Sequence, residues 1–348
     1  MRAMAVTAYG EPLVEIDVAE PVVPHGYALL EVVTCGVCFS DVKVSRGLMP
    51  FSDTVALPHI PGHEIFGRVL RTEPEGLVEP GTRGTVFHSW SCGRCEACRR
   101  GDLALCDNLL GWVGFTTPGG FRERIAVPVD RIIAIPPSID PVHAAPMSCA
   151  LGTAYRSVVV RGGVKASSTV AVIGLGGVGI HAAQIARAAG AWVVGFDPHE
   201  ATRAAARELN LVARPSDDDA VDDALREVGR EGFDVVVDTV AHGETVAMAN
   251  RLVRRGGRIV VVGYGPRSVV GVDTSRLVLD EIDVVGSRYA HLDDLERAVA
   301  LVADDRVRTI VGLVAPLDRV NEVFAALEAG EVVGRAVLDV AGVAGPAP

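Results

Sequence analysis

The chain has 348 residues, and at roughly 150 residues per domain this length predicts two domains. Its 33 basic and 44 acidic residues give a formal net charge of −11 at pH 7. This charge argues against binding to nucleic acid or to anionic membranes, because both require a basic surface. Hydrophobic residues make up 49% of the chain and charged residues 22%, as in a folded globular protein rather than a disordered one. The first residues lack a secretory signal pattern and no uninterrupted apolar span follows, so we expect a cytoplasmic protein.

The first 150 residues combine short β-branched runs with frequent turn residues. The runs at Leu29–Val33, Ile125–Val127 and Arg131–Ile135 are separated by glycine, proline and aspartate. This pattern predicts short antiparallel strands joined by turns. We therefore expect a β-rich amino-terminal region.

From about residue 167 onward, strand and helix patterns alternate. Strands are predicted at Ser168–Gly174, Trp192–Phe196, Phe233–Asp238 and Arg258–Gly263. Helices are predicted after Gly179 and at Glu200–Leu209, Asp217–Gly229, Glu244–Val253, Leu292–Ala303 and Val320–Leu327. Strands that alternate with helices indicate a parallel sheet covered on both faces, so this part predicts an α/β fold.

A glycine-rich loop follows the first of these strands. Its sequence, Gly174-Leu-Gly176-Gly177-Val178-Gly179, fits the G-x-G-x-x-G pattern that brings a pyrophosphate to the start of a helix. The next strand ends at Asp197, a carboxylate that can accept both hydroxyls of an adenosine ribose and would repel a 2′-phosphate. NAD is therefore favoured over NADP, although the nearby Arg203 could meet a phosphate. A glycine turn in another α/β fold is the alternative interpretation.

Four of the seven cysteines lie close together in the pattern Cys92-x2-Cys95-x2-Cys98-x7-Cys106. Four thiolates around one Zn²⁺ form a closed tetrahedral site, which is structural because no position stays open to a substrate. A ferredoxin-type iron–sulfur motif would bring the fourth cysteine back sooner and follow it with proline. Disulfides are disfavoured in a reducing compartment. The pattern therefore predicts a structural zinc.

A second metal constellation is much more dispersed. Cys38, His63 and Cys149 would form a Cys2His set with one open position, as in a catalytic zinc site. The spacing of these three residues does not show whether they bind a metal, because a lone histidine or cysteine is more often a core or surface residue. Cys35 remains as a packed thiol.

Several motifs occur in an order that resembles the zinc-dependent medium-chain alcohol dehydrogenase family. They are Cys35-Gly-Val-Cys38-Phe-Ser40-Asp41, Pro61-Gly62-His63-Glu64, the Cys92–Cys106 lobe, Cys149-Ala-Leu-Gly-Thr153-Ala-Tyr155 and the Gly174–Gly179 loop. The resemblance implies a GroES-like, partly barrel-shaped β-rich catalytic domain at residues 1–150, with a structural-zinc lobe at about 90–108. It further implies a Rossmann NAD-binding domain with a doubly wound parallel sheet at 151–288 and a return to the catalytic domain at 289–348.

The same resemblance implies roles for particular residues. Cys38, His63 and Cys149 would hold the catalytic zinc, and Glu64 would lie behind the metal as a transient ligand. Asp41 would hold the second nitrogen of His63. The cofactor would contact Thr153 near the nicotinamide, Arg335 at the pyrophosphate, and the glycine loop with Val178. Ser40 would pass the substrate proton outward.

Two positions beside the first zinc cysteine depart from the family pattern. Phe39 stands where many members carry His or Arg, and Lys43 stands where many carry the last histidine of the proton relay. Lys43 is therefore interpreted as the end of the relay or as a cofactor contact, with a solvated helix lysine as the alternative. Three residues that would line the substrate pocket precede the cysteine lobe: Phe87, His88 and Trp90. Four further apolar residues would contribute to the same pocket: Leu48, Met49, Phe51 and Phe115.

The leading functional hypothesis is a zinc- and NAD-dependent enzyme that interconverts an alcohol and its aldehyde or ketone, with two zinc ions per chain. The alternatives are a reductase of activated double bonds on the same fold and a non-catalytic nucleotide-binding relative. The expected partners are a small-molecule substrate and further copies of the chain. The family resemblance implies a homodimer or homotetramer that forms through edge strands of the Rossmann sheet, with Arg258–Gly263 and Val284–Ser287 as the candidate strands.

Overall fold

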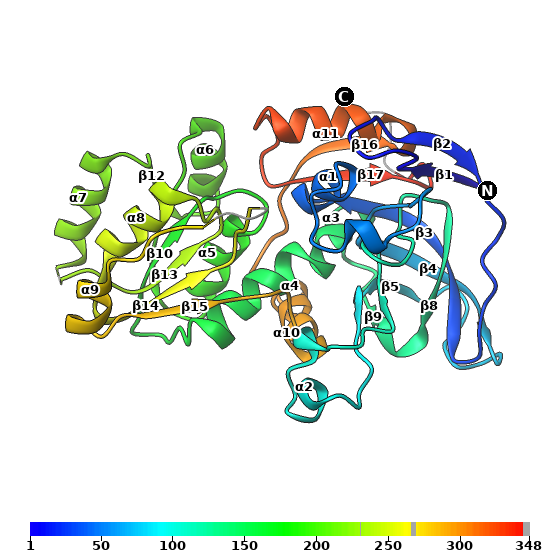
Figure 1. The fold of residues 1–348 in the computed structure, drawn as a ribbon, viewed down its shortest axis with the longest axis horizontal. Coiled ribbons are helices and arrows are strands. Elements are labelled where there is room, and N and C mark those ends of the chain that lie inside the picture. The colour runs from blue at the N-terminus through cyan, green and yellow to red at the C-terminus, as the bar shows by residue number, and fades with distance from the viewer. Residues whose placement is uncertain (230, 266–268, 344–348) are drawn as a thin grey trace. The chain divides into compact units, whose positions relative to one another are not determined.

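The computed structural model describes residues 1–229, 231–265 and 269–343, and these divide into two compact units. One, called here the β-rich unit, comprises residues 1–149, 291–303 and 311 onward. The other, called the parallel-sheet unit, comprises residues 150–290 and 304–310. Figure 1 shows the first unit mainly in blue, cyan and red and the second mainly in green and yellow.

A seven-stranded sheet forms the centre of the β-rich unit. The unit contains β1 (Arg2–Ala5), β2 (Val14–Asp17), β3 (Tyr27–Val37), α1 (Phe39–Ser45), β4 (Glu64–Glu73), β5 (Arg83–Val86), β6 (Ser89–Trp90), α2 (Glu96–Arg99), β7 (Gly111–Trp112), β8 (Arg124–Pro128), β9 (Ile132–Ala134), α3 (Pro141–Ala144), α10 (Leu292–Ala303), β16 (Val311–Pro316), α11 (Val320–Glu328) and β17 (Arg335–Asp339). The main sheet has the order β16-β17-β3-β4-β5-β9, and β8 pairs with β3 outside this path. Every pairing is antiparallel except that of β16 with β17.

The register at the end of β3 determines where the functional side chains of this unit meet. Gly36 of β3 lies opposite Glu64 of β4, and Val37 lies opposite Ala336 of β17. The residue after β3, the residue before β4 and the first residue of β17 therefore emerge at the same edge of the sheet. These residues are Cys38, His63 and Arg335.

The parallel-sheet unit is built around six strands that all run in the same direction. It contains α4 (Ala150–Tyr155), β10 (Thr169–Ile173), α5 (Gly179–Ala188), β11 (Trp192–Phe196), α6 (Glu200–Glu208), β12 (Val212–Arg214), α7 (Asp218–Val228), β13 (Phe233–Asp238), α8 (Gly243–Leu252), β14 (Val253–Val261), α9 (Thr274–Leu279) and β15 (Asp283–Gly286). The sheet order is β12-β11-β10-β13-β14-β15, which in order along the chain reads 3-2-1-4-5-6. All five residues of β10 are buried, as expected for a strand covered on both faces. The predicted α/β class with a parallel sheet is confirmed.

Most predicted elements lie within a few residues of the observed ones, and the differences have local causes. The predicted strand at Leu29–Val33 is the middle of β3, which pairs with strands on both sides. Its eleven residues are mostly buried, and side chains such as Leu30 and Val32 belong to the hydrophobic core. The strand predicted to begin at Arg258 begins five residues earlier, at Val253. Gly256, with φ +61°, lets the backbone turn within this longer strand. Helix α9 is not predicted from the sequence, because none of its residues is buried and its apolar residues show no helical periodicity.

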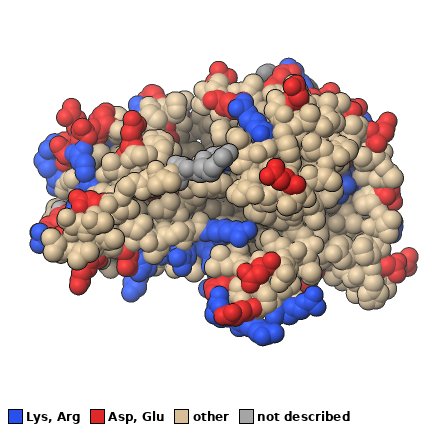
Figure 2. All heavy atoms as spheres, viewed as in Figure 1, with Lys and Arg blue, Asp and Glu red and all other residues tan. Residues whose placement is uncertain are grey.

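Acidic and basic side chains are interspersed on the face of the molecule shown in Figure 2. Ion pairs such as that of Arg251 with Asp222, at 2.8 Å, join charges of opposite sign on the surface. Among the described residues, no helix combines the length and the apolar character that crossing a bilayer requires.

Candidate metal and cofactor sites

Cys38, His63, Glu64 and Cys149 form a compact cluster at the end of β3. One potential ligand atom from each residue lies within 4.8 Å of those of the other three. His63 and Glu64 are completely buried and Cys38 is 8% exposed. Glu64 fits because its neighbour across the sheet is a glycine, and a Cβ on Gly36 would overlap the Glu64 carboxylate. The fold thus unites residues that are separated by as many as 111 positions in the sequence.

Asp41 determines which nitrogen of His63 faces the cluster. This buried carboxylate, in the first turn of α1, accepts hydrogen bonds from the backbone N–H groups of Cys38 at 2.8 Å and Gly62 at 3.1 Å. Its Oδ1 also lies 3.0 Å from Nδ1 of His63, which must donate because a carboxylate accepts. Nε2 of His63 makes no hydrogen bond of normal geometry with any described residue. A neutral histidine held in this way presents Nε2 as a metal ligand.

The electrostatics of the cluster favour a bound cation. Cys149 donates a hydrogen bond to Cys38, which holds the pKa of Cys38 well below its ordinary value and raises that of Cys149 well above it. Burial raises the pKa of Glu64 to about 7, although the Arg335 guanidinium, 3.1 Å from Oε1, opposes this shift. Several groups that are anionic when ionised are therefore buried together, and a divalent metal is the usual compensation for such a donor set.

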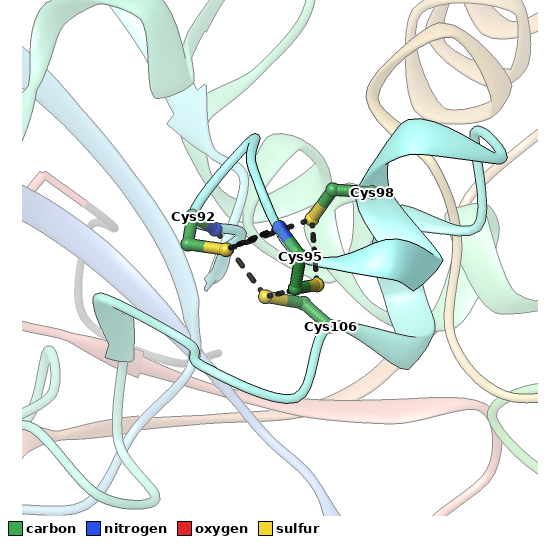
Figure 3. A group of neighbouring side chains, drawn as sticks. All are labelled: Cys92, Cys95, Cys98 and Cys106. Carbon is green, nitrogen blue, oxygen red and sulfur yellow. Dashed lines mark hydrogen bonds between the residues drawn. The ribbon is translucent and has the colours of Figure 1, made fainter.

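The four cysteines of the predicted lobe converge around a single point (Figure 3). The Sγ atoms of Cys95 and Cys98 are 3.5 Å apart, and Cys95–Cys106 and Cys92–Cys98 are each separated by 3.9 Å. A tetrahedral zinc with Zn–S bonds of about 2.3 Å places its sulfur ligands about 3.8 Å apart. All four are free cysteines rather than disulfides. The residues therefore fit a closed tetrahedral zinc site.

A third group also brings potential ligands together, but its geometry has a structural explanation. His291, Asp293 and Asp294 have ligand atoms within 4.8 Å of one another. The carboxylate of Asp294 accepts the backbone N–H of His291 at 2.9 Å, as a side chain in the first turn of a helix commonly does. The proximity of these three residues is therefore explained by the start of α10.

The glycine-rich loop connects β10 to α5 at the point where the strand order of the sheet reverses. Each glycine of the pattern has a distinct environment. Gly174 has φ +81°, which favours glycine, and a Cβ on Gly179 would overlap the carbonyl oxygen of Gly174. A Cβ on Gly176, by contrast, would meet no atom of the described residues within 4 Å, apart from those of its own chain neighbours. The protein itself therefore does not require glycine at position 176, which is the position where a pyrophosphate would approach the backbone.

Asp197 lies at the end of β11 beside this loop. Its carboxylate is buried and accepts backbone N–H groups of Leu175 at 2.8 Å and His199 at 2.9 Å. A carboxylate has about four acceptor positions, so two remain for ribose hydroxyls. The guanidinium of Arg203 donates to the carbonyl oxygens of Asp197 at 2.7 Å and Pro198 at 2.8 Å and pairs with Glu200. These contacts already occupy much of its donor capacity.

The remaining predicted residues fall into different environments. Ser40 is half-buried in the first turn of α1. Lys43, in the same helix, is half-buried with its ammonium 5.9 Å from the Phe39 ring centroid, and burial lowers its pKa. Arg335 is buried beside Glu64, and its contact with a cofactor stays a prediction. Thr153 lies in α4, four residues after Cys149.

The three predicted pocket residues that precede the cysteine lobe divide between the core and the metal cluster. Trp90 packs against Tyr27 at 6.1 Å between ring centroids and donates its indole N–H to the carbonyl of Phe87. Phe87 is almost completely buried. His88 instead lies edge-on to the His63 ring, at 5.0 Å between centroids.

An aromatic cluster beside the metal ligands was only partly predicted. Phe115 packs on His63 at 4.6 Å between ring centroids and stacks on Trp112 at 4.3 Å, and Phe51 contacts both Phe115 and Trp112. Trp112 carries no motif. It lies three residues before Phe115 in the chain and joins the cluster by stacking on that ring.

Comparison with known proteins identifies the family. The family model described as an alcohol dehydrogenase GroES-like domain matches residues 24–137, and that described as a zinc-binding dehydrogenase matches residues 177–304. An alcohol dehydrogenase from Geobacillus stearothermophilus is 32% identical over 98% of this chain and its own whole length.

Solved structures agree with these matches. An alcohol dehydrogenase from Aeropyrum pernix is 29% identical, with a TM-score of 0.89 over 98% of this chain and all of that one. An acetophenone reductase from Geotrichum candidum, solved with NAD, is 27% identical, with a TM-score of 0.85 over 99% of this chain and 98% of that one.

The chain belongs to the zinc-dependent medium-chain alcohol dehydrogenase family. It is an oxidoreductase that interconverts an alcohol and its aldehyde or ketone, and its cofactors are zinc and NAD(H). These relatives favour this activity over the two alternatives, double-bond reduction and a non-catalytic role. The predicted GroES-like and Rossmann architecture of the enzyme is confirmed.

Proposed function

We propose that the cluster at the end of β3 is the catalytic centre, with Cys38, His63 and Cys149 as zinc ligands. The observation that carries this proposal is the buried Nε2 of His63, which makes no hydrogen bond of normal geometry with a described residue and lies close to two cysteine sulfurs. A Cys2His set leaves one tetrahedral position open. Bound zinc would supply a Lewis acid that lowers the pKa of a substrate hydroxyl or polarises a carbonyl.

The residues around the ligands have separate tasks in this proposal. Asp41 holds the His63 ring in the orientation and tautomer that present Nε2. Glu64 lies behind the ligands as a transient ligand, and Arg335 balances its charge. The Arg335 guanidinium also offsets part of the negative charge of the centre when both cysteines are deprotonated.

Helix α1 provides the proposed route for the substrate proton. Ser40 follows the ligand Cys38 by two residues, and its hydroxyl can both accept and donate a proton. Lys43 lies one turn further along the helix. Because burial lowers its pKa, it accepts a proton more reversibly than an exposed lysine does.

A lysine substitution tests this route. Lys43→Met should shift the limb of the pH profile of kcat/KM that reports proton release. Lys165→Met, at the only other lysine and on an exposed loop, should leave the profile unchanged. A profile for Lys43→Met that superimposes on that of the wild type would assign Lys43 no part in the relay and leave water as the terminal acceptor.

We propose a bulky apolar or aromatic alcohol, or the corresponding ketone, as the substrate. A continuous aromatic group beside His63 is formed by Phe115, Trp112 and Phe51. His88 also contacts the His63 ring, in a T-shaped arrangement. Aromatic rings stack favourably on such a surface. The likeness to a protein named acetophenone reductase supports this substrate class.

A substrate panel tests the proposed function directly. Primary, secondary, aromatic and polyol alcohols are oxidised with NAD, and NADH formation is followed with two zinc ions per chain verified by metal analysis. We expect aromatic and secondary alcohols to give the highest kcat/KM. A highest kcat/KM for polyols would refute the proposed substrate class, and inactivity towards every alcohol with both zinc ions bound would refute the proposed catalytic centre.

For NAD, we propose that the pyrophosphate lies at Gly176, Gly177 and Val178, the adenosine ribose at Asp197 and the nicotinamide near Thr153. Arg203 is then a loop-stabilising residue, because its guanidinium is engaged with carbonyl oxygens of its own loop. The open space around the Cβ position of Gly176 supports this placement.

Gly176→Ala separates cofactor binding from folding. The added methyl group would contact none of the described residues beyond its chain neighbours. The thermal midpoint should therefore stay within about 1 °C of the wild type, whereas the dissociation constant for NADH should rise at least tenfold. Unchanged NADH affinity would refute the proposed position of the pyrophosphate. Gly229→Ala is an unsuitable control because its φ is +63°; Gly243→Ala, with open space and no positive φ, is the matched variant.

We propose a cytoplasmic homo-oligomer in which two copies pair through β15. This strand is at the edge of the described parallel sheet, and three of its four residues are exposed. The prediction of the other candidate, from Arg258, as an edge strand is wrong, because it belongs to β14, which pairs with β13 and β15. Val278 and Leu279, just before β15, are 70% and 80% exposed, which is unusual for side chains of this kind. An unpaired edge strand next to apolar residues fits a second copy of itself.

The mass in solution tests this assembly. Leu279→Glu should lower the fraction of oligomer measured by analytical ultracentrifugation. Val22→Glu, at a similarly exposed apolar residue of the β-rich unit, should leave that fraction unchanged. A monomeric wild-type protein, or an assembly that survives Leu279→Glu, would contradict this interface.

A further inference from the structure

His181, a buried histidine of α5, connects two backbone segments that are far apart in the sequence. Its Nδ1 lies 2.6 Å from the carbonyl oxygen of Gly177, in the glycine-rich loop. Its Nε2 lies 3.3 Å from the backbone nitrogen of Ile310. Because a carbonyl oxygen can only accept and an amide N–H can only donate, these partners assign a neutral ring with its hydrogen on Nδ1.

One turn further along α5, Gln184 holds the same distant segment. Its amide oxygen accepts the backbone N–H of Arg308 and its amide nitrogen donates to the Arg308 carbonyl, both at 2.9 Å. Val307 and Thr309 of this segment are almost completely buried. Residues 304–310 thus belong to the parallel-sheet unit, although the elements on either side, α10 and β16, belong to the β-rich unit. His181 is the member of this pair that also contacts the cofactor loop.

The contact with Gly177 fixes a peptide group that a phosphate would use. The carbonyl of Gly177 and the N–H of Val178 belong to one planar peptide and point in opposite directions. Val178 is the N-cap residue of α5, directly before its first residue, and N–H groups at a helix start point outward, to where an anion binds. A hydrogen bond that holds the Gly177 carbonyl toward His181 therefore holds the Val178 N–H toward an incoming phosphate.

We propose that His181 is a positioning residue for NAD(H), because its hydrogen bond to Gly177 pre-orients the Val178 N–H for the pyrophosphate. It acts through the loop backbone and does not itself contact the cofactor. The inference rests on the proposed position of the pyrophosphate at this loop. Pre-orientation reduces the ordering that binding would otherwise require, so the effect appears in cofactor affinity.

Three substitutions of His181 separate its two hydrogen bonds. Asparagine places an amide nitrogen near the position of Nδ1 but is too short to reach Ile310. Glutamine can make both contacts, as Gln184 does when it donates to the carbonyl four residues before it, that of Ile180, and also reaches Arg308. Leucine fills space but makes neither contact. Gln184→Met is the matched control, because it releases Arg308 from the same helix without touching Gly177.

Fluorescence and calorimetry give the dissociation constants for two ligands, NADH and ADP-ribose. ADP-ribose retains the pyrophosphate but lacks the nicotinamide, so its binding reports on the pyrophosphate contact without a contribution from the nicotinamide. A lost hydrogen bond of ordinary strength corresponds to about a five- to tenfold change. We expect this loss for His181→Leu with both ligands, together with a raised KM for NAD and an unchanged KM for alcohol. His181→Asn and His181→Gln should bind within about twofold of the wild type. His181→Asn and Gln184→Met should lower the thermal midpoint without weakening NADH binding.

Two outcomes would overturn the proposal. One is NADH affinity within twofold of the wild type for His181→Leu. The other is an equal loss of affinity for His181→Asn or Gln184→Met, since this would mean that general loosening of α5, and not the Gly177 contact, controls binding. The proposed pyrophosphate position fails separately, if Gly176→Ala binds NADH normally. A loss for Gly176→Ala with none for His181→Leu would refute the role of His181 alone.

Discussion

Asp41→Asn removes one acceptor from the carboxylate that orients the proposed catalytic zinc ligand. In the wild type, Oδ1 accepts from Gly62 N–H and His63 Nδ1, and Oδ2 accepts from Cys38 N–H, at distances of 2.8–3.1 Å. The carboxylate is completely buried, so water cannot replace a lost acceptor. Asparagine offers a single oxygen and can therefore satisfy only part of this network.

Two orientations of the asparagine amide are available, and both carry a cost. With its oxygen in the place of Oδ1, the amide nitrogen faces the N–H of Cys38 and leaves that donor unsatisfied. With the oxygen in the place of Oδ2, the nitrogen faces Gly62 and His63, and the His63 ring must change tautomer and place its hydrogen on Nε2. The first orientation preserves the ligand nitrogen, so we expect it to dominate.

The size of the effect follows from this loss. A buried donor without a partner costs about 1–3 kcal/mol. Loss of a partner that orients a metal ligand commonly weakens metal binding by about 10- to 100-fold, which corresponds to about 1.4–2.8 kcal/mol. We expect Asp41→Asn to lose its catalytic zinc to a chelator at concentrations that leave the wild type intact, with kcat falling in proportion to the zinc content.

The four-cysteine site provides an internal standard for this measurement. Zinc per chain is determined by mass spectrometry after titration with the chelator, and we expect the variant to approach one zinc per chain while the wild type keeps two. Asp140→Asn, at an exposed aspartate that only caps α3 through the N–H of Val142, should behave as the wild type. Retention of two zinc ions by Asp41→Asn at wild-type chelator resistance would refute this account of Asp41.

Three further predictions follow from other contacts. Cys106→Ser should leave one zinc per chain and lower the thermal midpoint by about 5 °C or more, because a three-thiolate site binds zinc less tightly; two retained zinc ions would contradict the assigned structural site. Phe115→Ala should raise KM for benzyl alcohol more than for ethanol, and equal changes would remove Phe115 from the substrate pocket. Although burial raises the pKa of Asp234, hydrogen bonds from Thr169 and Arg254 lower it below its ordinary value. Its stabilising effect is therefore present above the unfolded pKa of about 3.9 and is lost as pH falls through the lower folded value. Asp234→Asn should reduce the unfolding free energy at pH 7 by about 1.5–3 kcal/mol, with the difference from wild type shrinking below pH 4; a difference independent of pH would refute the assignment.

Features encoded by neighbouring residues could be predicted from the sequence. The four cysteines from Cys92 to Cys106 lie within 15 residues, and the Gly174–Gly179 loop within six, so the ligand geometry of each is largely a property of one short segment. Helices and strands of the parallel sheet follow from apolar periodicity, because burial on one or both faces leaves a repeat in the sequence. Spacing therefore suffices to predict a metal site and a nucleotide-binding loop.

Features that depend on pairing between distant strands required the tertiary structure. Cys38, His63 and Cys149 have no informative spacing, and only the family resemblance linked them in the sequence. The register of β3 with β4 and β17 brings Cys38, His63 and Arg335 to one edge of the sheet. The same holds for Phe51 beside Trp112 and for His181 beside Ile310. A contact between residues far apart in the chain leaves no periodic trace in a single sequence, since it arises from strand register and packing, which only the folded chain defines.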